Sequence, residues 1–454
     1  MSASLGRPPI MFIDLWPIDH PMVVVGSYEI AEQITKASKL FPYSPPKANK
    51  IFDHMGDDWK VLRKRFNAGF AYQHLMSFLP LVIEKGFTFL GLLDGFTSTG
   101  QDFSLLHLTT NLTFDIIGGV VMDLELGAQN LESSDRNEFI RVFRDLIHSY
   151  TSEQMDLPSW LVPRTTWKRY RLAKRVKSML RNTVINKYDN LQKGGDIPSR
   201  SILSLSLQDV NPLTPEVVEE TCDQISTFLF AGHDTTSILL SWVFYELSRT
   251  PHALSAVRDE LDKLFGPDPS PSAVRARLLS GHAEELLNRM TYTAAVIKET
   301  LRLWPPAGTG RMTKPGTGLT VQTPIGEYCL DGMLIYNCAS IIMRDPSVYG
   351  DTADVFVPER WLQDAAKIPA GAWRPFERGP RNCIGQELAN IEARVIIALV
   401  ARRYDFIKIG TGEVALDSVG KPIMGKNGQY KVVSEMYSVS YLKPMLKTVY
   451  CIRG

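Results

Sequence analysis

The sequence contains few cysteines and no pattern that would pair them. Five occur in 454 residues: Cys222, Cys329, Cys338, Cys383 and Cys451. The number is odd and no two have CxxC spacing, so the sequence indicates neither a disulfide framework nor a cysteine-rich zinc site. This usage favours a reducing intracellular compartment.

An excess of charge of one sign and a long apolar run are also missing. The 50 Lys and Arg residues nearly balance the 49 Asp and Glu residues, so no global field favours nucleic acid as a partner. No stretch approaches the roughly 18 consecutive apolar residues of a transmembrane helix. We therefore expect the chain as written not to be an integral membrane protein and to lack an N-terminal membrane anchor.

Linkers, low-complexity segments and internal repeats are absent too, which predicts a single domain over residues 1–454. The pattern of apolar residues is mainly helical with a minor β region. We predict two short strands joined by a turn at 10–25, a helix at 28–38, mostly helices at 57–195, a helix at 291–303, strands at 318–343, a loop region at 345–380 and a last long helix beginning near Cys383.

The longest predicted helix begins with Thr214 as its cap and Pro215 in its first turn, and it ends before Pro251. Its roughly 36 residues would span about 54 Å, so it should cross the core. Its middle is apolar on nearly all sides, as a buried helix requires. One polar cluster at 232–236 interrupts it and needs a reason.

The strongest local motif surrounds Cys383 and reads FERGPRNCIGQELA over 376–389. A thiolate just before a helix gains the positive end of the helix dipole and free backbone N–H groups, which lower its pKa. Gly379 and Gly385 leave space for a flat macrocycle beside the backbone, and Arg381 can meet a carboxylate of that macrocycle. A buried structural cysteine after a turn is the alternative. However, the spacing Phe-x-x-Gly-x-Arg-x-Cys-x-Gly fixes five residues within ten positions, which chance explains poorly.

This segment resembles the haem-binding loop of the cytochrome P-450 superfamily. The resemblance covers roughly residues 10–445 and implies the P-450 fold, a large helical core crossed by one long central helix, with a small β-rich part. It implies haem b as the cofactor, Cys383 as the iron ligand, and Phe376 and Gly385 as further residues of the haem-binding loop. An axial thiolate favours cleavage of the O–O bond.

The polar cluster of the longest helix, AGHDTT over 231–236, resembles the oxygen-activation motif of the same family. Small residues would leave room for O2, and Asp234 and Thr235 would order water and relay protons. In the competing interpretation the Thr hydroxyls bond within the helix and Asp234 lies on a polar face. The presence of Cys383 favours the catalytic interpretation.

Glu299 and Arg302 resemble the Glu-x-x-Arg pair of the family, and the PERW segment resembles the one whose arginine, here Arg360, completes a Glu/Arg/Arg cluster. Pairs at this spacing share one helix face and usually contribute little when exposed. The resemblance implies a structural role, in which the three residues lock the loop that carries Cys383.

Four further residues are assigned to the haem propionates by resemblance: Trp59, Arg63, Arg311 and Arg381. Trp59 and Arg63 match the family's Trp-x-x-x-Arg element. Each signal alone is weak, because a helical Trp/Arg spacing also fits packing beside a solvated charge.

The resemblance implies a monooxygenase that inserts one atom of O2 into a lipophilic organic substrate. NADPH-cytochrome P-450 reductase would supply the electrons, with cytochrome b5 as an optional second donor. One alternative is a haem-thiolate isomerase or dehydratase that acts on a peroxide, although such relatives tend to lose the Thr that this chain keeps at Thr235. A second alternative is a truncated, non-catalytic haem binder.

Two basic stretches suggest surfaces, and both also fit a solvated helix face. Lys60, Arg63, Lys64 and Arg65 would dock an acidic reductase. Residues 164–187 carry nine basic side chains and no acid, which fits contact with a membrane surface. A full-length form would lie on the cytoplasmic face of the endoplasmic reticulum, and the sequence as written would be cytoplasmic.

The substrate pocket is expected from segments near 40–56, 145–185, 226–236, 306–311 and 436–442. Their lining would include Phe52, Phe228, Phe230, Met436 and Tyr437. The style of the motifs resembles fungal secondary-metabolism members. The sequon Asn111-Leu-Thr113 lies in an apolar helical run, so we expect it not to be glycosylated.

Overall fold

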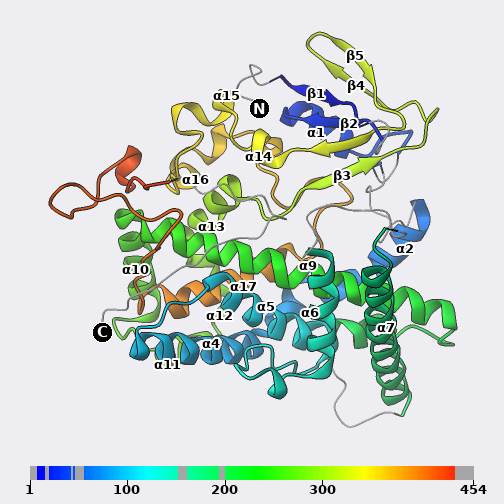
Figure 1. The fold of residues 1–454 in the computed structure, drawn as a ribbon, viewed down its shortest axis with the longest axis horizontal. Coiled ribbons are helices and arrows are strands. Elements are labelled where there is room, and N and C mark those ends of the chain that lie inside the picture. The colour runs from blue at the N-terminus through cyan, green and yellow to red at the C-terminus, as the bar shows by residue number, and fades with distance from the viewer. Residues whose placement is uncertain are drawn as a thin grey trace.

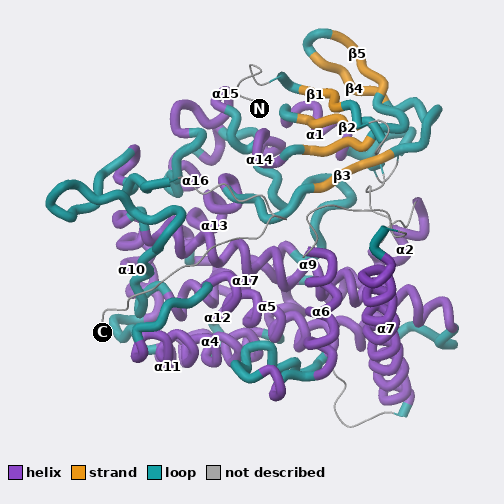
Figure 2. The backbone as a smooth tube through the Cα atoms, viewed as in Figure 1, coloured by secondary structure: helices purple, strands orange, loops and turns teal. Residues whose placement is uncertain are grey.

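The computed structural model describes residues 8–15, 20–41, 44–45, 56–151, 161–193 and 200–434. Helices form most of this part of the chain, and the named strands gather at one end of it (Figures 1 and 2). The prediction of a mainly helical fold with a minor β region is therefore confirmed.

The helices divide into long ones that build the body and short ones that connect them. The long helices are α2 (Gly56–Asn67), α4 (Leu79–Thr99), α5 (Leu105–Met122), α6 (Glu138–Thr151), α7 (Pro163–Gln192), α9 (Pro215–Ser248), α10 (Pro251–Phe265), α13 (Thr291–Leu303) and α17 (Gln386–Val400). The short helices are α1 (Tyr28–Thr35), α3 (Tyr72–Met76), α8 (Ile202–Leu207), α11 (Pro271–Leu278), α12 (Ala283–Arg289), α14 (Ala339–Ile342), α15 (Pro346–Tyr349) and α16 (Arg360–Gln363).

The main sheet joins the N-terminal part of the chain to residues 309–337. Its strands are β1 (Ile10–Ile13), β2 (Met22–Val25), β3 (Thr309–Met312) and β6 (Leu334–Asn337), in the order β1-β2-β6-β3. The β1–β2 and β3–β6 pairs are antiparallel, and the β2–β6 pair is parallel. A separate antiparallel hairpin comprises β4 (Thr320–Thr323) and β5 (Gly326–Cys329).

Helix α9 is the longest described helix and crosses the whole helical body (Figure 1). The hydroxyl of its cap, Thr214, accepts a hydrogen bond from the Val217 amide, and Pro215 stands in the first turn, as predicted. Helices α5, α7, α13 and α17 pack against it. By length and composition α5 resembles a membrane span, but 78% of that span is buried, so it packs as a core helix.

Several predicted boundaries shift in the structure. Helix α1 ends at Thr35, three residues before the predicted end, because Lys36 turns to an extended conformation. Strand β3 was not predicted, since its sequence TGRM lacks the apolar alternation of a strand, and it forms by pairing with β6. The predicted strand region 318–343 ends in the short helix α14 instead. Helix α17 begins at Gln386, three residues after Cys383.

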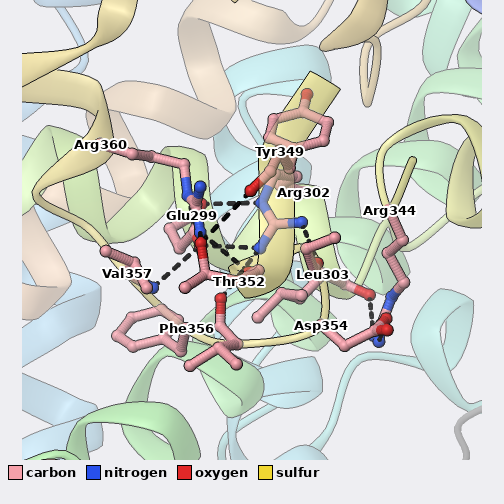
Figure 3. A network of polar contacts seen from close by, with 12 residues as sticks. Glu299, Arg302, Leu303, Arg344, Tyr349, Thr352, Asp354, Phe356, Val357 and Arg360 are labelled. Carbon is pink, nitrogen blue, oxygen red and sulfur yellow. Dashed lines mark hydrogen bonds and ion pairs between the residues drawn. The ribbon is translucent and has the colours of Figure 1, made fainter. Parts of the chain in front are cut away.

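A buried ionic cluster joins α13 to the start of α16 and the residues just before it (Figure 3). The Glu299 carboxylate accepts hydrogen bonds from Arg302 at 2.8 and 2.9 Å and from Arg360 at 3.1 Å. The Val357 amide and the Trp361 indole also donate to this carboxylate, each at 2.9 Å. The side chains of Glu299 and Arg302 are fully buried, so this carboxylate is the counter-charge that makes two buried guanidinium groups tolerable.

Aromatic side chains connect this cluster to the loop that carries Cys383. The Trp361 ring contacts the Trp373 ring, which in turn contacts the Phe376 ring, with centroids 5.9 and 6.1 Å apart. The Trp373 indole also donates a hydrogen bond to the carbonyl of Lys298 on α13. The cluster therefore supports the start of the loop, in line with the structural role predicted for Glu299, Arg302 and Arg360.

Replacing Glu299 with Gln should strongly destabilise the protein. The change leaves two arginines buried without a counter-charge, which costs about 3–5 kcal/mol. Glu285→Gln is the matched control, because its ion pair with Arg289 on α12 is exposed and contributes less than about 1 kcal/mol. Urea unfolding followed by circular dichroism measures both free energies, and equal losses for the two variants would refute the role of the cluster.

Candidate active site

The loop around Cys383 is a compact turn held by its own backbone. The amide of Cys383 donates to the carbonyl of Phe376 at 2.8 Å, and the amide of Asn382 donates to the carbonyl of Gly379 at 3.2 Å. Glu377 and Gly379 adopt positive φ values of 55° and 78°. These interactions present the exposed Cys383 thiol at the end of the turn.

Glycine is required at position 379 for a steric reason that the sequence alone did not reveal. A Cβ atom at Gly379 would lie 2.0 Å from the carbonyl oxygen of Thr35, the last residue of α1. The loop therefore packs directly on the backbone of an N-terminal helix. At Gly385 a Cβ atom would meet nothing nearer than the Cys383 sulfur at 4.0 Å, so this glycine leaves the space beside the sulfur open.

Residues from α2 hold the loop from the other side. Arg63 donates to the carbonyl and the side-chain oxygen of Asn382, at 2.9 and 3.1 Å. The Arg381 guanidinium lies 4.4 Å from the centre of the Trp59 ring and is almost fully buried. The structure thus brings Trp59, Arg63 and Arg381 together beside Cys383, and it adds a direct bond between Arg63 and the loop.

Arg311 on β3 is the most unusual charge in the described ranges. Its side chain is fully buried, and none of its three guanidinium nitrogens has a hydrogen-bond partner there. Burial lowers its pKa to about 10, while Glu377 acts in the opposite direction. A buried cation without a partner is costly. An anionic group such as a haem carboxylate would satisfy it, so the residues present fit a haem.

Arg374 and Glu377 complete this side of the site and were missed by the sequence analysis. Arg374 is almost fully buried and donates to the Glu377 carboxylate at 2.8 Å and to the Thr35 hydroxyl at 3.2 Å. The Asn337 amide at the end of β6 donates to the same carboxylate at 3.1 Å. In the sequence, only the position of Arg374 and Glu377 close to Cys383 pointed to these two residues. That position did not reveal their contacts with distant residues such as Thr35.

The polar cluster of α9 presents two different faces. Ala231, Asp234 and Thr235 lie on one side and retain some exposure, whereas His233 and Thr236 are buried. The Thr235 hydroxyl donates to the carbonyl of Ala231 at 2.8 Å. Burial raises the pKa of Asp234, and no residue of the described ranges hydrogen-bonds to its carboxylate. The Thr235 hydroxyl hydrogen is thus bonded within the helix, as in the competing interpretation, while its oxygen and the adjacent Asp234 carboxyl group can still accept hydrogen bonds.

Gly232 lies where α9 packs against α5, and the expectation that the small pair leaves room for O2 stays a prediction. A Cβ atom at Gly232 would lie 2.7 Å from Cδ1 of Ile117 on α5, so this glycine allows the two helices to approach closely. Of the small pair, only Ala231 is on the more exposed side.

Helix α17 contributes a buried acid that was not predicted. The side chains of Glu392 and Thr236 are hydrogen-bonded, and burial raises the pKa of Glu392 to about 8. Because α17 follows directly after Cys383 and Thr236 follows directly after Thr235, this contact connects the two predicted motifs through a pair of packed helices.

The predicted substrate pocket is only partly described. Phe52, Met436, Tyr437 and segment 436–442 lie outside the described residues, as does most of 40–56. Phe228 is buried and contacts the rings of two core phenylalanines, with centroids 5.0 and 5.1 Å away, and its place in the pocket lining stays a prediction. Phe230, 200° further around the helix, is 37% exposed and remains a candidate.

Comparison with known proteins relates the chain to one family. The model of the cytochrome P-450 family matches residues 9–429. The chain is 30% identical over 428 residues to cytochrome P-450 monooxygenase acrF of Aspergillus aculeatus, covering 87% of this chain and 83% of the relative. It is 31% identical over 303 residues to the bifunctional cytochrome P-450/NADPH–P-450 reductase of Gibberella moniliformis, covering 66% of this chain and 26% of the relative.

The fold is similar to a solved haem domain. The crystal structure of the cytochrome P-450DA haem domain superposes with a TM-score of 0.73 at 17% identity, covering 92% of this chain and 88% of that one. The two chains therefore share the fold that the resemblance implied. With the family match and the fungal relative, the thiol loop and the buried arginine lead to one conclusion: the chain belongs to the cytochrome P-450 family of haem enzymes.

Proposed function

We propose that the protein is a monooxygenase that inserts one oxygen atom of O2 into a lipophilic organic substrate. The substrate R–H, O2, two electrons and two protons give R–OH and water. The observation that carries this proposal is the packing of α9 on α17, where the side chains of Thr236 and Glu392 are hydrogen-bonded. Thr236 follows the acid–alcohol pair in α9, and α17 begins three residues after Cys383. Haem held by a thiolate supplies the chemistry that cleaves the O–O bond.

We assign the haem contacts to the loop and to the arginines that face it. Cys383 is the proposed iron ligand, and Phe376 and Gly385 shape the loop beside it. Arg311 is the principal proposed partner of a propionate, because its guanidinium has no hydrogen-bond partner among the described residues. Trp59, Arg63 and Arg381 are the other proposed propionate contacts, and Arg63 also donates a hydrogen bond to Asn382.

Asp234 and Thr235 are the proposed proton-handling residues. The hydroxyl hydrogen of Thr235 is engaged with the Ala231 carbonyl, so its oxygen is oriented to accept a hydrogen bond. Burial raises the pKa of Asp234, which therefore keeps a proton at a higher pH than an exposed carboxyl group does. A carboxyl group that can release and regain a proton beside a fixed hydroxyl suits general acid catalysis.

The electron donor that we propose is NADPH-cytochrome P-450 reductase, with cytochrome b5 as an optional second donor. The reductase fused to the Gibberella moniliformis relative supports this pairing. On α2, Lys60 and Lys64 are exposed and can meet an acidic partner. The other two basic residues of the predicted face turn inward, since Arg63 binds Asn382 and Arg65 hydrogen-bonds to Thr221.

We also propose that the protein acts in fungal secondary metabolism and that its full-length form lies on the cytoplasmic face of the endoplasmic reticulum. A single domain over residues 1–454 is part of this proposal. The outer side of α7 supports membrane contact, because Trp167 and Tyr170 are 61% and 63% exposed among basic residues. Figure 1 shows α7 standing at the edge of the helical body.

Turnover with different oxidants tests the proposed reaction. Holoprotein supplied with NADPH, a P-450 reductase and a panel of lipophilic compounds should form a product that carries one atom from labelled O2. A haem-thiolate isomerase or dehydratase would instead convert a hydroperoxide without NADPH or reductase. Holoprotein that consumes no NADPH and converts no hydroperoxide would indicate a non-catalytic haem binder.

Replacing Thr235 with Ala should uncouple NADPH use from product formation. With proton delivery impaired, O2, two electrons and two protons leave as hydrogen peroxide, and product per NADPH should fall by about tenfold or more, since general acid–base groups contribute roughly 10²–10⁴-fold. Thr227→Ala is the matched control, because Thr227 makes the same bond to a preceding carbonyl two turns earlier in α9. Unchanged coupling in Thr235→Ala would count against the relay.

Replacing Arg311 with Leu should weaken haem binding. Loss of a charge-assisted hydrogen bond to a propionate should accelerate haem transfer to apomyoglobin by about tenfold or more. Arg378→Gln is the control, because Arg378 lies in the loop that carries Cys383 and pairs with Glu32 at 2.8 Å. Equal haem-transfer rates for Arg311→Leu and the unaltered protein would contradict the assignment.

A further inference from the structure

The sequon of α5 has a structural use. Asn111 and Thr113 are 3% and 1% exposed, so a glycan has no access to this segment. The Thr113 hydroxyl oxygen lies 2.6 Å from the backbone carbonyl oxygen of His233 on α9. The carbonyl oxygens of Thr109 and Thr110 are farther away, at 2.9 and 3.2 Å, so the single hydroxyl hydrogen is assigned to His233. His233 directly precedes Asp234, and this bond therefore reaches the turn that carries both proposed proton-handling residues.

The next residue of α5 fixes the same histidine through its ring. The rings of Phe114 and His233 are stacked, with centroids 3.8 Å apart and an angle of 21° between their planes. Nδ1 of His233 lies 2.8 Å from the Leu229 carbonyl, which can only accept, so Nδ1 carries the hydrogen. Burial lowers the pKa of His233 to about 4, which keeps the stacked ring neutral in neutral solution.

A third contact is the close packing of α9 on α5 at Gly232. Gly232 packs against Ile117, and a Cβ atom there would lie 2.7 Å from its side chain. Thr113, Phe114 and Ile117 occupy one face of α5, being separated by one and three residues. All three reach the two residues of α9 that come immediately before Asp234.

These contacts determine where Asp234 and Thr235 point. Successive residues of an α-helix are 100° apart, so Gly232 and His233 define the side of α9 that faces α5. Ala231, Asp234 and Thr235 then fall on the opposite side, where Ala231 is exposed and the other two are half-buried. A small rotation of α9 about its axis would turn both proton-handling residues together.

We propose that Thr113 is a positioning residue for the reaction, because its bond to the His233 carbonyl, with the Phe114 and Ile117 contacts, sets the rotation of α9 at Asp234 and Thr235. This inference rests on the proposed function of those two residues. Thr113 touches neither substrate nor cofactor and acts only through the backbone of α9.

Thr113→Val tests the proposal because it keeps the shape of the side chain and removes the hydroxyl. Losing one buried hydrogen bond changes a conformational population by about fivefold. Product per NADPH should therefore fall by about fivefold, with a matching rise in hydrogen peroxide. Thr113→Ser, which restores the hydroxyl, should recover at least half of the coupling of the unaltered protein.

Thr109→Val is the matched control. Thr109 is equally buried on α5, and its hydroxyl contacts two polar groups of α9, the carbonyl of Ser237 at 3.2 Å and the hydroxyl of Ser241 at 3.1 Å. A purely structural effect of losing an α5–α9 hydrogen bond would lower coupling in both valine variants alike, and that result would overturn the proposal. Coupling that falls only in Thr113→Val, with recovery in Thr113→Ser, supports it.

Hydrogen exchange of the holoprotein provides a readout that needs no turnover. Amides of α9 between 233 and 237 should exchange about fivefold faster in Thr113→Val than in Thr109→Val. If Thr235→Ala leaves coupling intact, the proposed relay fails. If Thr235→Ala uncouples the enzyme but the two valine variants behave alike, only the role of Thr113 is refuted.

Discussion

The site depends on keeping one sulfur atom exposed and fixed at the same time. The hydrogen bond from the Cys383 amide to the Phe376 carbonyl closes the turn that presents the thiol. On one side of the loop Arg63 donates a hydrogen bond to Asn382, and on another side Gly379 packs against the carbonyl of Thr35. A loop held only by the hydrogen bonds of its own turn would be mobile, whereas this loop is also fixed by α1 and α2, which are far away in the sequence.

The charges around the loop are arranged in two groups with different functions. In the first group the Glu299 carboxylate neutralises Arg302 and Arg360, and all three guanidinium nitrogens of Arg302 have hydrogen-bond partners, which suits a supporting structure. In the second group Arg311 is buried without a partner among the described residues. A cluster whose charges are hydrogen-bonded to one another stabilises the fold, whereas a buried cation without a hydrogen-bond partner indicates a ligand. The hydrogen bonds of the buried arginines therefore distinguish the Glu299 cluster, which supports the loop, from Arg311, which is proposed to bind the haem.

Much of this arrangement follows from short-range sequence patterns. The cap and first-turn proline of α9, the helical spacing of Glu299 and Arg302 and the turn before Cys383 each depend on residues close together in the chain, and each was predicted. Contacts between distant segments were not. The pairing of Thr113 with His233, of Glu392 with Thr236 and of Arg374 with Thr35 depends on how helices rotate and pack. Phe228 shows the same limit, because its apolar side chain fits a core and a pocket equally well.

Ligation of iron by the Cys383 sulfur is the claim on which the rest depends. The most direct measurement is the absorption spectrum of the purified holoprotein after reduction and addition of carbon monoxide. We expect the red-shifted Soret band of thiolate-ligated haem, and we expect Cys383→Ala to abolish that band. A spectrum without the shift, or one that Cys383→Ala leaves unchanged, would contradict the account.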